Sequence, residues 1–459
     1  MMSFPSSGKN FTVRRQKPEL IPPSRPTPHE TKPLSDIDDQ LGLRFYIHQL
    51  NFYPNKGGND QKDPVEVIKA ALADVLVHFY PLAGRLREGP GRKLSVDCNE
   101  EGVRFVEADA DVTLEELGED LQPPFPYLEE VLHNANPIPG SDEFLNSPMV
   151  FVQVTRLRCG GFIFAAGHNH AVADGLGIIQ FAKAMGEIAS GASAPSIQPV
   201  WMRELLYARN PPRITCVHRE YDEVIPTTEQ NNKIKTPEEM VNTSLVFGPE
   251  EISDLRANSL PADFRQKCST FDLMTASIWR GRIAALQMNP EEEVKVVCIV
   301  NARHRFDPPL PEGYYGNAVA APVAITTAGE LVKNPLEYAV TLLRKAKSEV
   351  TEEYIKSTAD LMVLRGRPIL NMSSTHLVSD VTRVGFDDID FGWGRPTYAG
   401  PARAASEMVP GVPTTFYVPK HNKNGERIGT VAPVCLPASA MDRFIIEIAR
   451  LMGRRPLIR

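Results

Sequence analysis

The sequence predicts an α/β protein built from two domains. Its 459 residues exceed what one hydrophobic core usually serves, so two domains are expected. Segments rich in β-branched and apolar residues, typical of strands, alternate with segments of helical periodicity in both halves of the chain. A stretch rich in Ser, Pro and Arg at 190–215 separates the two halves. We therefore predict an N-terminal domain over 1–190, a crossover linker over 191–220 and a C-terminal domain over 221–459.

The first clear element is a helix over residues 65–79, in which apolar residues recur at helical spacing. Asp63 is suited to cap its N-terminus, and the proline that follows fits the first helical position. Pro81 prevents the helix from continuing. Strands over 93–97 and 103–107 are predicted next, on either side of a Glu-Glu-Gly turn.

A hairpin of buried strands is predicted over residues 149–157 and 162–166. Both segments are rich in β-branched and apolar residues, and a Cys-Gly-Gly turn joins them. The second strand runs directly into the segment Gly-His-Asn-His-Ala-Val-Ala-Asp-Gly at 167–175. Residues 176–188 are apolar with helical periodicity, so a helix is expected to follow that segment.

The second half of the chain repeats the alternation of strands and helices. Ser269 or Thr270 is suited to cap the N-terminus of the first helix of this half. The predicted elements are strands over 244–247 and 294–300 and helices over 271–286 and 336–350.

Composition and charge argue against several classes of partner. Apolar residues make up 42% of the chain and charged residues 23%, which is the ordinary balance of a globular protein. The net charge is −7 and no basic face or tail is present, which argues against nucleic acid, although a local basic patch for an anionic cofactor remains open. No run reaches the roughly 18 apolar residues that a membrane helix needs, so we expect no membrane partner.

The cysteines and the two ends of the chain point to the cytoplasm. The six cysteines are scattered without a CxxC pair, so we expect reduced thiols rather than disulfides. The first eleven residues contain no apolar stretch that resembles a signal peptide. The final residues, 456–459, do not resemble a Ser-Lys-Leu peroxisomal signal.

His170 and Asp174 are the first candidates for chemistry. On a continuous helix, residues four apart would share a face, which suggests a His–Asp dyad. A strand is predicted to end at Ala166, however, and Gly175 marks a turn, so the segment is expected to be a loop in which the two side chains can point apart. Catalytic residues often lie on such a loop at the end of a strand.

A neutral histidine near pH 7 can take a proton from a hydroxyl group, which is the chemistry that His170 offers. The HxxxD spacing also occurs by chance, and a structurally satisfied histidine is the alternative interpretation. His168 and His170 would share a face of a strand, which suggests a metal site. No third ligand lies at a suggestive spacing and HExxH is absent, so we expect no metal.

A second segment, Asp-Phe-Gly-Trp-Gly at 390–394, lies between polar and proline-containing sequence. Glycines on both sides of Trp393, Gly392 and Gly394, allow a sharp backbone path and close approach of neighbouring residues. Trp393 could line a channel, or it could simply pack against the core.

The two segments together, about 215 residues apart, resemble the motifs of the plant BAHD acyltransferase family. The likeness extends from near residue 12 to near residue 445, and it is strongest to the alcohol acyltransferase branch, which includes the benzyl alcohol benzoyltransferases. Further stretches that carry this likeness are 18–23, 34–40, 80–86, 314–318 and 379–383.

The resemblance implies a chloramphenicol-acetyltransferase-like fold. Two similar-sized domains of mixed β-sheet with flanking helices would meet along an active-site channel, and a segment near 375–400 would pack with the N-terminal domain. An acyl-CoA would enter the channel from one side and an alcohol from the other. It also implies a monomer that holds no permanent cofactor and uses acyl-CoA as a co-substrate, because a thioester with its good leaving group needs no metal.

The resemblance also assigns roles to individual residues. His170 matches the catalytic base, and Asp174 matches a residue that turns away and holds the loop through Arg303. Asp390 opens the second motif and is the other catalytic candidate, although this motif lies away from the reacting centre in the family and a structural role suits it better. Trp393 and Gly392 would support the site.

Two hydroxyl residues have alternative interpretations. Ser269 and Thr270 match a hydroxyl position near the pantetheine or the oxyanion in the family, but either is equally suited to cap a helix. Three residues depart from the branch pattern, and they put the acceptor in doubt rather than the reaction: His168, Ala171 and Ala173.

Several functions remain open at this stage. Benzoyl-CoA with benzyl alcohol is the first expectation for the substrates, and acetyl-CoA with small alcohols is the second. Acylation of an alkaloid alcohol by the same chemistry is an alternative. A non-catalytic binding member of the fold is a second class of function. A hydrolase is a third, and the missing GxSxG argues against it and favours direct transfer without an acyl-enzyme.

Overall fold

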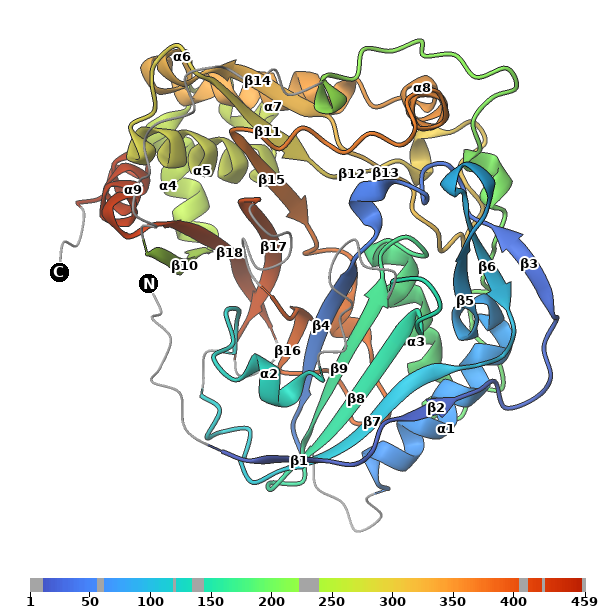
Figure 1. Ribbon diagram of the computed structural model, residues 1–459. Helices are drawn as coiled ribbons and strands as arrows, with labels where there is room; N and C mark the ends of the chain where they lie inside the picture. Colours follow the sequence, from blue (N-terminus) through green and yellow to red (C-terminus); the bar gives the residue numbers. More distant parts are fainter. Residues whose placement is uncertain are drawn as a thin grey trace.

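The computed structural model describes residues 11–55, 62–118, 121–133, 144–222, 239–403, 412–422 and 426–455. Two mixed β-sheets, each covered by helices, dominate the fold and confirm the predicted α/β class (Figure 1). A three-stranded and a two-stranded sheet accompany them. In the described part of the chain, no helix is both long and apolar enough to cross a membrane.

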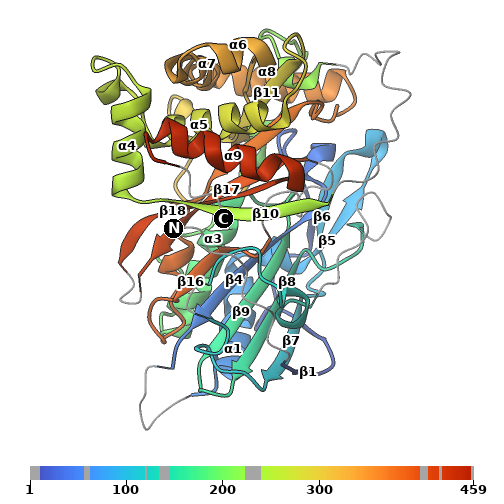
Figure 2. The same cartoon turned by 90° about the vertical axis from the view of Figure 1, so that its left-hand side faces the viewer.

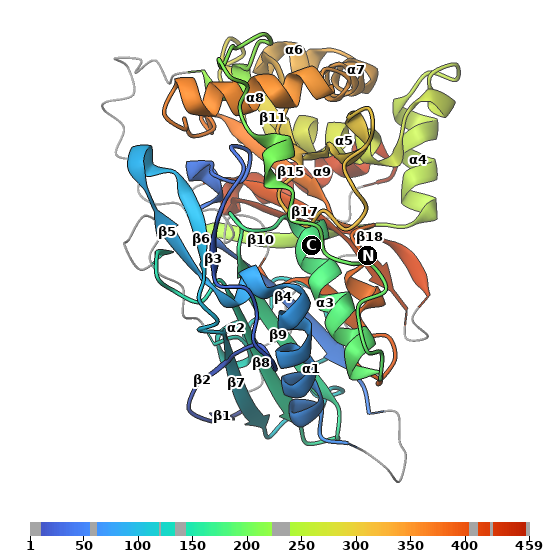
Figure 3. The same cartoon turned by 90° about the vertical axis from the view of Figure 1, so that its right-hand side faces the viewer.

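The larger sheet has seven strands and occupies the lower half of Figure 1. Its order is β1-β7-β8-β9-β4-β16, with β2 also paired to β7, and among the strands that the structure describes here only the β7–β8 pair is parallel. Helices α1 and α3 lie side by side on one face of it (Figure 3). The elements are β1 (Val13–Arg15), β2 (Glu19–Ile21), β4 (Tyr46–Tyr53), β7 (Val103–Ala110), β8 (Val150–Leu157), β9 (Phe162–Asn169), β16 (Tyr398–Pro401), α1 (Pro64–His78), α2 (Leu128–Val131) and α3 (Gly175–Ala189).

The six-stranded sheet has the order β10-β18-β17-β15-β11-β14. Helices α5 and α9 lie over its strands, as Figure 2 shows, and α7 packs against α5. The elements are β10 (Met240–Phe247), β11 (Glu293–Cys298), β14 (Val323–Thr327), β15 (Thr375–Asp380), β17 (Thr414–His421), β18 (Arg427–Pro437), α4 (Pro249–Ser259), α5 (Thr270–Leu286), α6 (Ala328–Lys333), α7 (Leu336–Ser348) and α9 (Ala438–Leu451).

The remaining elements lie at the edges of the two sheets. The three-stranded sheet has the order β3-β6-β5, β12 pairs with β13, and α8 packs beside the linker between the two halves. Their bounds are β3 (Glu30–Pro33), β5 (Arg85–Glu88), β6 (Leu94–Cys98), β12 (Val300–Asn301), β13 (Val319–Ala320) and α8 (Glu352–Leu364).

The elements that the local sequence signals predicted are present to within a few residues of their expected bounds, whereas strands such as β4 and β18 and helices such as α8 and α9 were not predicted. Asp63 accepts a hydrogen bond from the backbone N–H of Val65 and caps α1, as predicted. The difference nearest the candidate site lies in β9, which continues to Asn169 rather than ending at Ala166. The extra residues pair with β4 in antiparallel register, and this tertiary pairing was not visible in the local pattern.

The hydrophobic cores follow the two large sheets, with one exchange between them. Most of the core beneath α1 and α3 comes from residues before 190, but Phe386, Phe391 and Tyr398 belong to it as well. Strand β15 belongs to the six-stranded sheet, whereas β16 pairs with β4 at the edge of the seven-stranded one. The chain thus crosses to the seven-stranded sheet after β15. The domain boundaries predicted at 190 and 220 remain a proposal.

Candidate active site

His170 lies in the turn that directly follows β9 and precedes α3, as the predicted loop required. Its backbone N–H donates to the carbonyl of Phe45 at 2.8 Å, and its own carbonyl accepts from Nδ2 of Asn317 at 2.8 Å. The ring of Phe45 meets the imidazole edge to face, with centroids 5.3 Å apart. The backbone on both sides of the imidazole is therefore fixed.

The environment of His170 favours the neutral imidazole. The side chain is partly buried, and its Nδ1 is buried without a hydrogen-bond partner among the residues that the structure describes. Burial lowers the pKa of His170 below 6.5, because a low-dielectric surrounding disfavours the charged form. A neutral imidazole near pH 7 can accept a proton.

Asp174 is engaged by groups other than the imidazole. It is the N-cap of α3, and its Oδ1 accepts from the N–H of Gly177 at 3.0 Å. Arg303 binds both carboxylate oxygens, at 2.8 and 2.9 Å, and the N–H of Ala318 donates to Oδ2 at 3.1 Å. Burial opposes ionisation, but the charge of Arg303 and these donors hold the pKa of Asp174 below its usual value. The carboxylate is thus an anchor of the loop.

Arg303 reaches Asp174 from the other half of the chain. Its Nη2 donates to the carbonyl of Gly316 at 2.8 Å and its Nε to that of Tyr314 at 3.3 Å. These two carbonyls hold the guanidinium in a fixed orientation towards Asp174. The pair has the bidentate geometry that gives arginine–carboxylate contacts their strength. It joins the start of α3 to the segment that follows β12.

Two further side chains hold the loop, and neither was singled out as a site residue from the sequence. Nδ2 of Asn317 donates to the carbonyl of His170, and Nη2 of Arg203 donates to the carbonyl of Val172 at 2.8 Å. Asn317 belongs to one of the stretches that carry the family likeness, which was its only signal. Arg203 lies in the proline-rich linker, where nothing local indicated that it would be fully buried.

His168 lies in the core beneath α3. It is 4% exposed, its ring centroid is 6.1 Å from that of His170, and burial lowers its pKa to about 3. Together with Gln49, Phe164, Phe181 and mostly apolar neighbours, it lines a small cavity between the seven-stranded sheet and α3. His168 is thus a neutral histidine close to the candidate base.

Asp390 caps its own turn. Its side chain is exposed, and its Oδ1 accepts from the N–H groups of Gly392 at 2.8 Å and Gly394 at 2.6 Å. Both glycines have positive φ angles, +101° and +76°, a conformation that other residues adopt only with strain. The carbonyl of Asp390 also lies so close to Gly186 of α3 that a Cβ there would be 2.5 Å away.

The aromatic residues of this turn contact the end of β9 that is remote from His170. Trp393 meets Phe162 edge to face, with centroids 5.2 Å apart, and Phe391 packs against Phe164 at 4.9 Å. Phe162 is the first residue of β9 and His170 follows the last one. A strand rises about 3.3 Å per residue, so roughly 25 Å separates the two ends. The structure does not bring Asp390 or Trp393 together with His170.

Ser269 caps α5, as one of its two interpretations predicted. Its Oγ accepts from the N–H of Asp272 at 3.1 Å and donates to the carboxylate of Asp272 at 2.7 Å. Thr270 is the first residue of the helix, and both hydroxyl residues are exposed. Their contact with the pantetheine or the oxyanion stays a prediction.

A Ser-His-Glu arrangement lies where α8 contacts the linker. His218 Nε2 lies 2.9 Å from Oγ of Ser357, and its Nδ1 lies 3.0 Å from a carboxylate oxygen of Glu220. Ser357 is fully buried, and its Oγ also accepts the N–H groups of Thr215 and Cys216, at 3.0 Å each. A hydroxyl that is enclosed in this way is closed to a substrate, so these residues fasten the linker to α8.

Comparisons with known proteins agree with the motifs. A model of the Transferase family matches residues 11–450. The chain is 59% identical to benzyl alcohol O-benzoyltransferase of Nicotiana tabacum, over 98% of this chain and 95% of that protein. It is 52% identical to an alcohol acyl transferase 1 of Malus domestica, over 96% and 94%. The crystal structure of vinorine synthase superposes with a TM-score of 0.73 at 26% identity, covering 96% of this chain and 98% of that one.

Proposed function

Because the chain belongs to the Transferase family, the BAHD acyltransferases, we propose that it esterifies an alcohol with His170 as general base. It is an alcohol O-acyltransferase that takes the acyl group from an acyl-CoA. The observation that supports this role for His170 is its neutral, partly buried imidazole in a loop that four other segments hold.

The reaction needs one proton acceptor. His170 takes the proton of the alcohol hydroxyl as the oxygen attacks the carbonyl carbon of the thioester. The tetrahedral intermediate collapses, the carbon–sulfur bond breaks, and the departing CoA thiolate takes the proton from His170. No nucleophile-elbow sequence is present, so the transfer is direct within a ternary complex and forms no acyl-enzyme.

The residues around the base have supporting roles in this proposal. Asp174 and Arg303 hold the loop, because the carboxylate oxygens of Asp174 accept hydrogen bonds from Arg303, Gly177 and Ala318. Asp390 shapes an exposed turn at the far end of β9 and transfers no proton. Ser269 and Thr270 remain candidates for the wall of the acyl-CoA channel between the two sheets.

For the substrates we propose benzoyl-CoA and benzyl alcohol. Two relatives, 59% and 57% identical to this chain, are named benzyl alcohol O-benzoyltransferases, and this identity extends over 98% of the chain in both. Acetyl-CoA with a small alcohol is the alternative donor and acceptor, in keeping with the alcohol acyl transferases among the relatives. We further propose a cytoplasmic monomer, in which all six cysteines are free thiols.

A screen of donors against acceptors tests this function. Purified protein is mixed with benzoyl-CoA or acetyl-CoA and with benzyl alcohol or small aliphatic alcohols, and CoA release is followed with a thiol reagent. We expect CoA release that depends on the alcohol and is fastest with benzoyl-CoA and benzyl alcohol, together with an equal amount of ester. A folded protein that binds CoA but releases no thiol with any pair would instead be a binding member of the fold. Thiol release without an alcohol would indicate a hydrolase.

A further inference from the structure

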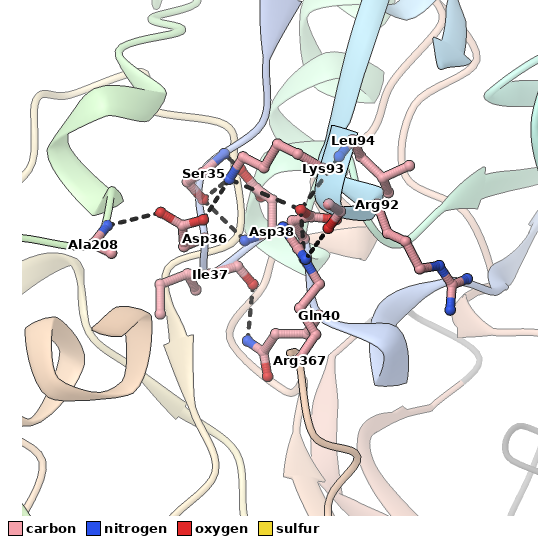
Figure 4. Close-up of polar contacts among 12 residues, drawn as sticks. Ser35, Asp36, Ile37, Asp38, Gln40, Arg92, Lys93, Leu94, Ala208 and Arg367 are labelled. Atoms are coloured by element: carbon pink, nitrogen blue, oxygen red, sulfur yellow. Dashed lines mark hydrogen bonds and ion pairs between the residues drawn. The ribbon is translucent and has the colours of Figure 1, made fainter. Parts of the chain in front are cut away.

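Three aspartates, at positions 36, 38 and 39, lie close together in the segment 34–40. Figure 4 shows this segment with Lys93, Ala208 and Arg367 around it. Asp36 accepts from Nζ of Lys93 at 2.5 Å and from the backbone N–H of Ala208 at 2.8 Å. These contacts join the segment to the three-stranded sheet and the linker. They do not extend to the loop that carries His170.

Asp39 shares Lys93 with Asp36, at 3.9 Å from Nζ, and has further partners of its own. Its carboxylate pairs with Arg44 at 3.1 Å and with Nε of Arg367 at 2.7 Å, and it accepts from the N–H of Leu94 at 3.3 Å. Burial raises the pKa of Asp39, and the surrounding cations oppose this shift. Asp39 thus ties the segment to its own half of the chain and to the residue that follows α8 by three positions.

Asp38 differs from both, because its partners lead to the catalytic loop. It is fully buried, and its Oδ1 accepts both the backbone N–H of Asn317 at 2.8 Å and Nδ2 of the same residue at 2.9 Å. Its Oδ2 accepts from Oγ of Ser35 at 2.7 Å and lies 3.3 Å from Nε of Arg203. The carboxylate is thus shared by Asn317 and Arg203.

These two partners of Asp38 are the ones that donate to the loop. Nδ2 of Asn317 also donates a hydrogen bond to the carbonyl of His170, and Arg203 donates one to the carbonyl of Val172. One buried carboxylate therefore orients both donors, and each donor fixes a carbonyl within three residues of the base. An amide held in this way cannot rotate without losing its contact with Asp38.

The Arg203 guanidinium is tightly enclosed by its neighbours. The guanidinium packs over Trp201, with 4.3 Å between its carbon and the ring centroid, and over Tyr315 at 4.9 Å. A Cβ on Gly316 would fall 1.5 Å from Nη1 of Arg203, so only glycine leaves room for it. Burial opposes the charge, but Asp38 and the aromatic neighbours raise the pKa of Arg203 above its usual value.

We propose that Asp38 is a positioning residue of the reaction, which acts on His170 through Asn317 and Arg203. It touches no reacting atom in this scheme. It holds the two donors that set the backbone of the loop, and the loop sets where the imidazole points. The inference rests on the proposed role of His170 as the base.

Two variants test it in the full-length protein. Asn317→Ala removes the donor to the His170 carbonyl but keeps Asp38, Arg203 and their contact. Asp38→Asn keeps one oxygen towards Asn317 and turns an NH2 group towards Ser35 and Arg203, which are themselves donors. Misplacement of a reacting group by about 1 Å can cost about a hundredfold in rate, so we expect kcat to fall about 10- to 100-fold in each variant. The KM and the Kd for benzoyl-CoA should not change.

Asp36→Asn is the control, because it makes the same change in the same segment at an aspartate whose partners, Lys93 and Ala208, lie outside the catalytic loop. It should lower the melting temperature and leave kcat unchanged. Full kcat in a folded Asp38→Asn protein would overturn the inference. If Asp38→Asn fails to fold, Asn317→Ala alone decides the matter.

A double-substitution cycle separates positioning from general damage. If Asp38 acts through His170, Asp38→Asn should not lower the residual rate of His170→Ala any further. An equal fractional loss in both backgrounds would overturn the inference and leave Asp38 as a stabilising residue only. Wild-type turnover in His170→Ala would instead overturn the proposed function, so the two failures are distinguishable.

Discussion

Substitution of His170 by alanine should lower kcat by about a thousandfold, because general acid–base catalysis typically contributes 10²–10⁴ in rate. The loss should fall on kcat rather than on the binding of acyl-CoA, since the proton transfer occurs after both substrates are bound. The fold should persist, because the backbone contacts of residue 170 with Phe45 and Asn317 do not involve the imidazole. Steady-state rates with benzoyl-CoA and benzyl alcohol, together with the affinity for CoA, measure both effects.

Asp390→Ala provides the matched control for this experiment. Asp390 belongs to the second motif, and its carboxylate accepts only from its own turn among the residues that the structure describes. Its loss should lower the melting temperature and leave kcat per folded molecule close to that of the wild type. A thousandfold loss of kcat in a fully folded Asp390→Ala protein would show that Asp390 takes part in the chemistry, contrary to the proposed mechanism.

Asp174→Ala should produce the largest loss of stability. Removing one partner of a buried ion pair typically costs about 3–5 kcal/mol, because the other charge is left uncompensated. Arg303 would be that charge, since Asp174 is 3% exposed and binds it through both oxygens. The start of α3 would lose its cap as well. Denaturant unfolding should show this loss, and the folded fraction should turn over at less than about a hundredth of the wild-type rate.

Ser269→Ala is a suitable comparison, because Ser269 caps α5 without a buried ion pair. Loss of such a cap typically costs about 1 kcal/mol. If Asp174→Ala is no more destabilising than Ser269→Ala, the ion pair with Arg303 contributes little, and the loop is held by other contacts. Arg303→Lys should lie between the two, since lysine keeps the charge but not the bidentate contact.

Local sequence patterns located the elements around the site because each carries its own signal. The helix that follows Asp63 and the turn between β9 and α3 depend on capping residues, prolines and glycines within a few positions. The loop interpretation of 170–174 followed from these neighbours alone. It correctly separated Asp174 from His170, because a strand that ends before the histidine leaves no continuous helix to align them.

The contacts that hold the loop could not be predicted from local pattern. Arg303 is 129 positions from Asp174, and Asn317 is 147 positions from His170. A pairing over such a distance leaves no periodicity, and the first of these pairs was expected only from the family likeness. Arg203 is fully buried although it lies in a linker whose composition indicates a surface loop, because Asp38 and three aromatic rings enclose it.

The crossing of the chain from the six-stranded sheet at β15 to the seven-stranded sheet at β16 also depends on a distant pairing. Strand β16 is four residues long and ends in proline, so it resembles a loop in sequence. It becomes a strand because β4 offers it an unpaired edge. The second motif reaches the N-terminal core by this route, where Phe391 packs against Tyr53 and Phe164.

The pH dependence of kcat/KM tests the central claim, that a neutral His170 is the base, most directly. Burial lowers the pKa of His170, so the imidazole is neutral and active above a pKa that lies below 6.5. The rate should be level through neutral pH and fall with one proton as the pH drops through that value, and the residual rate of His170→Ala should lack this fall. An acidic midpoint above 6.5 in the wild type, or the same acidic fall in His170→Ala, would contradict the account.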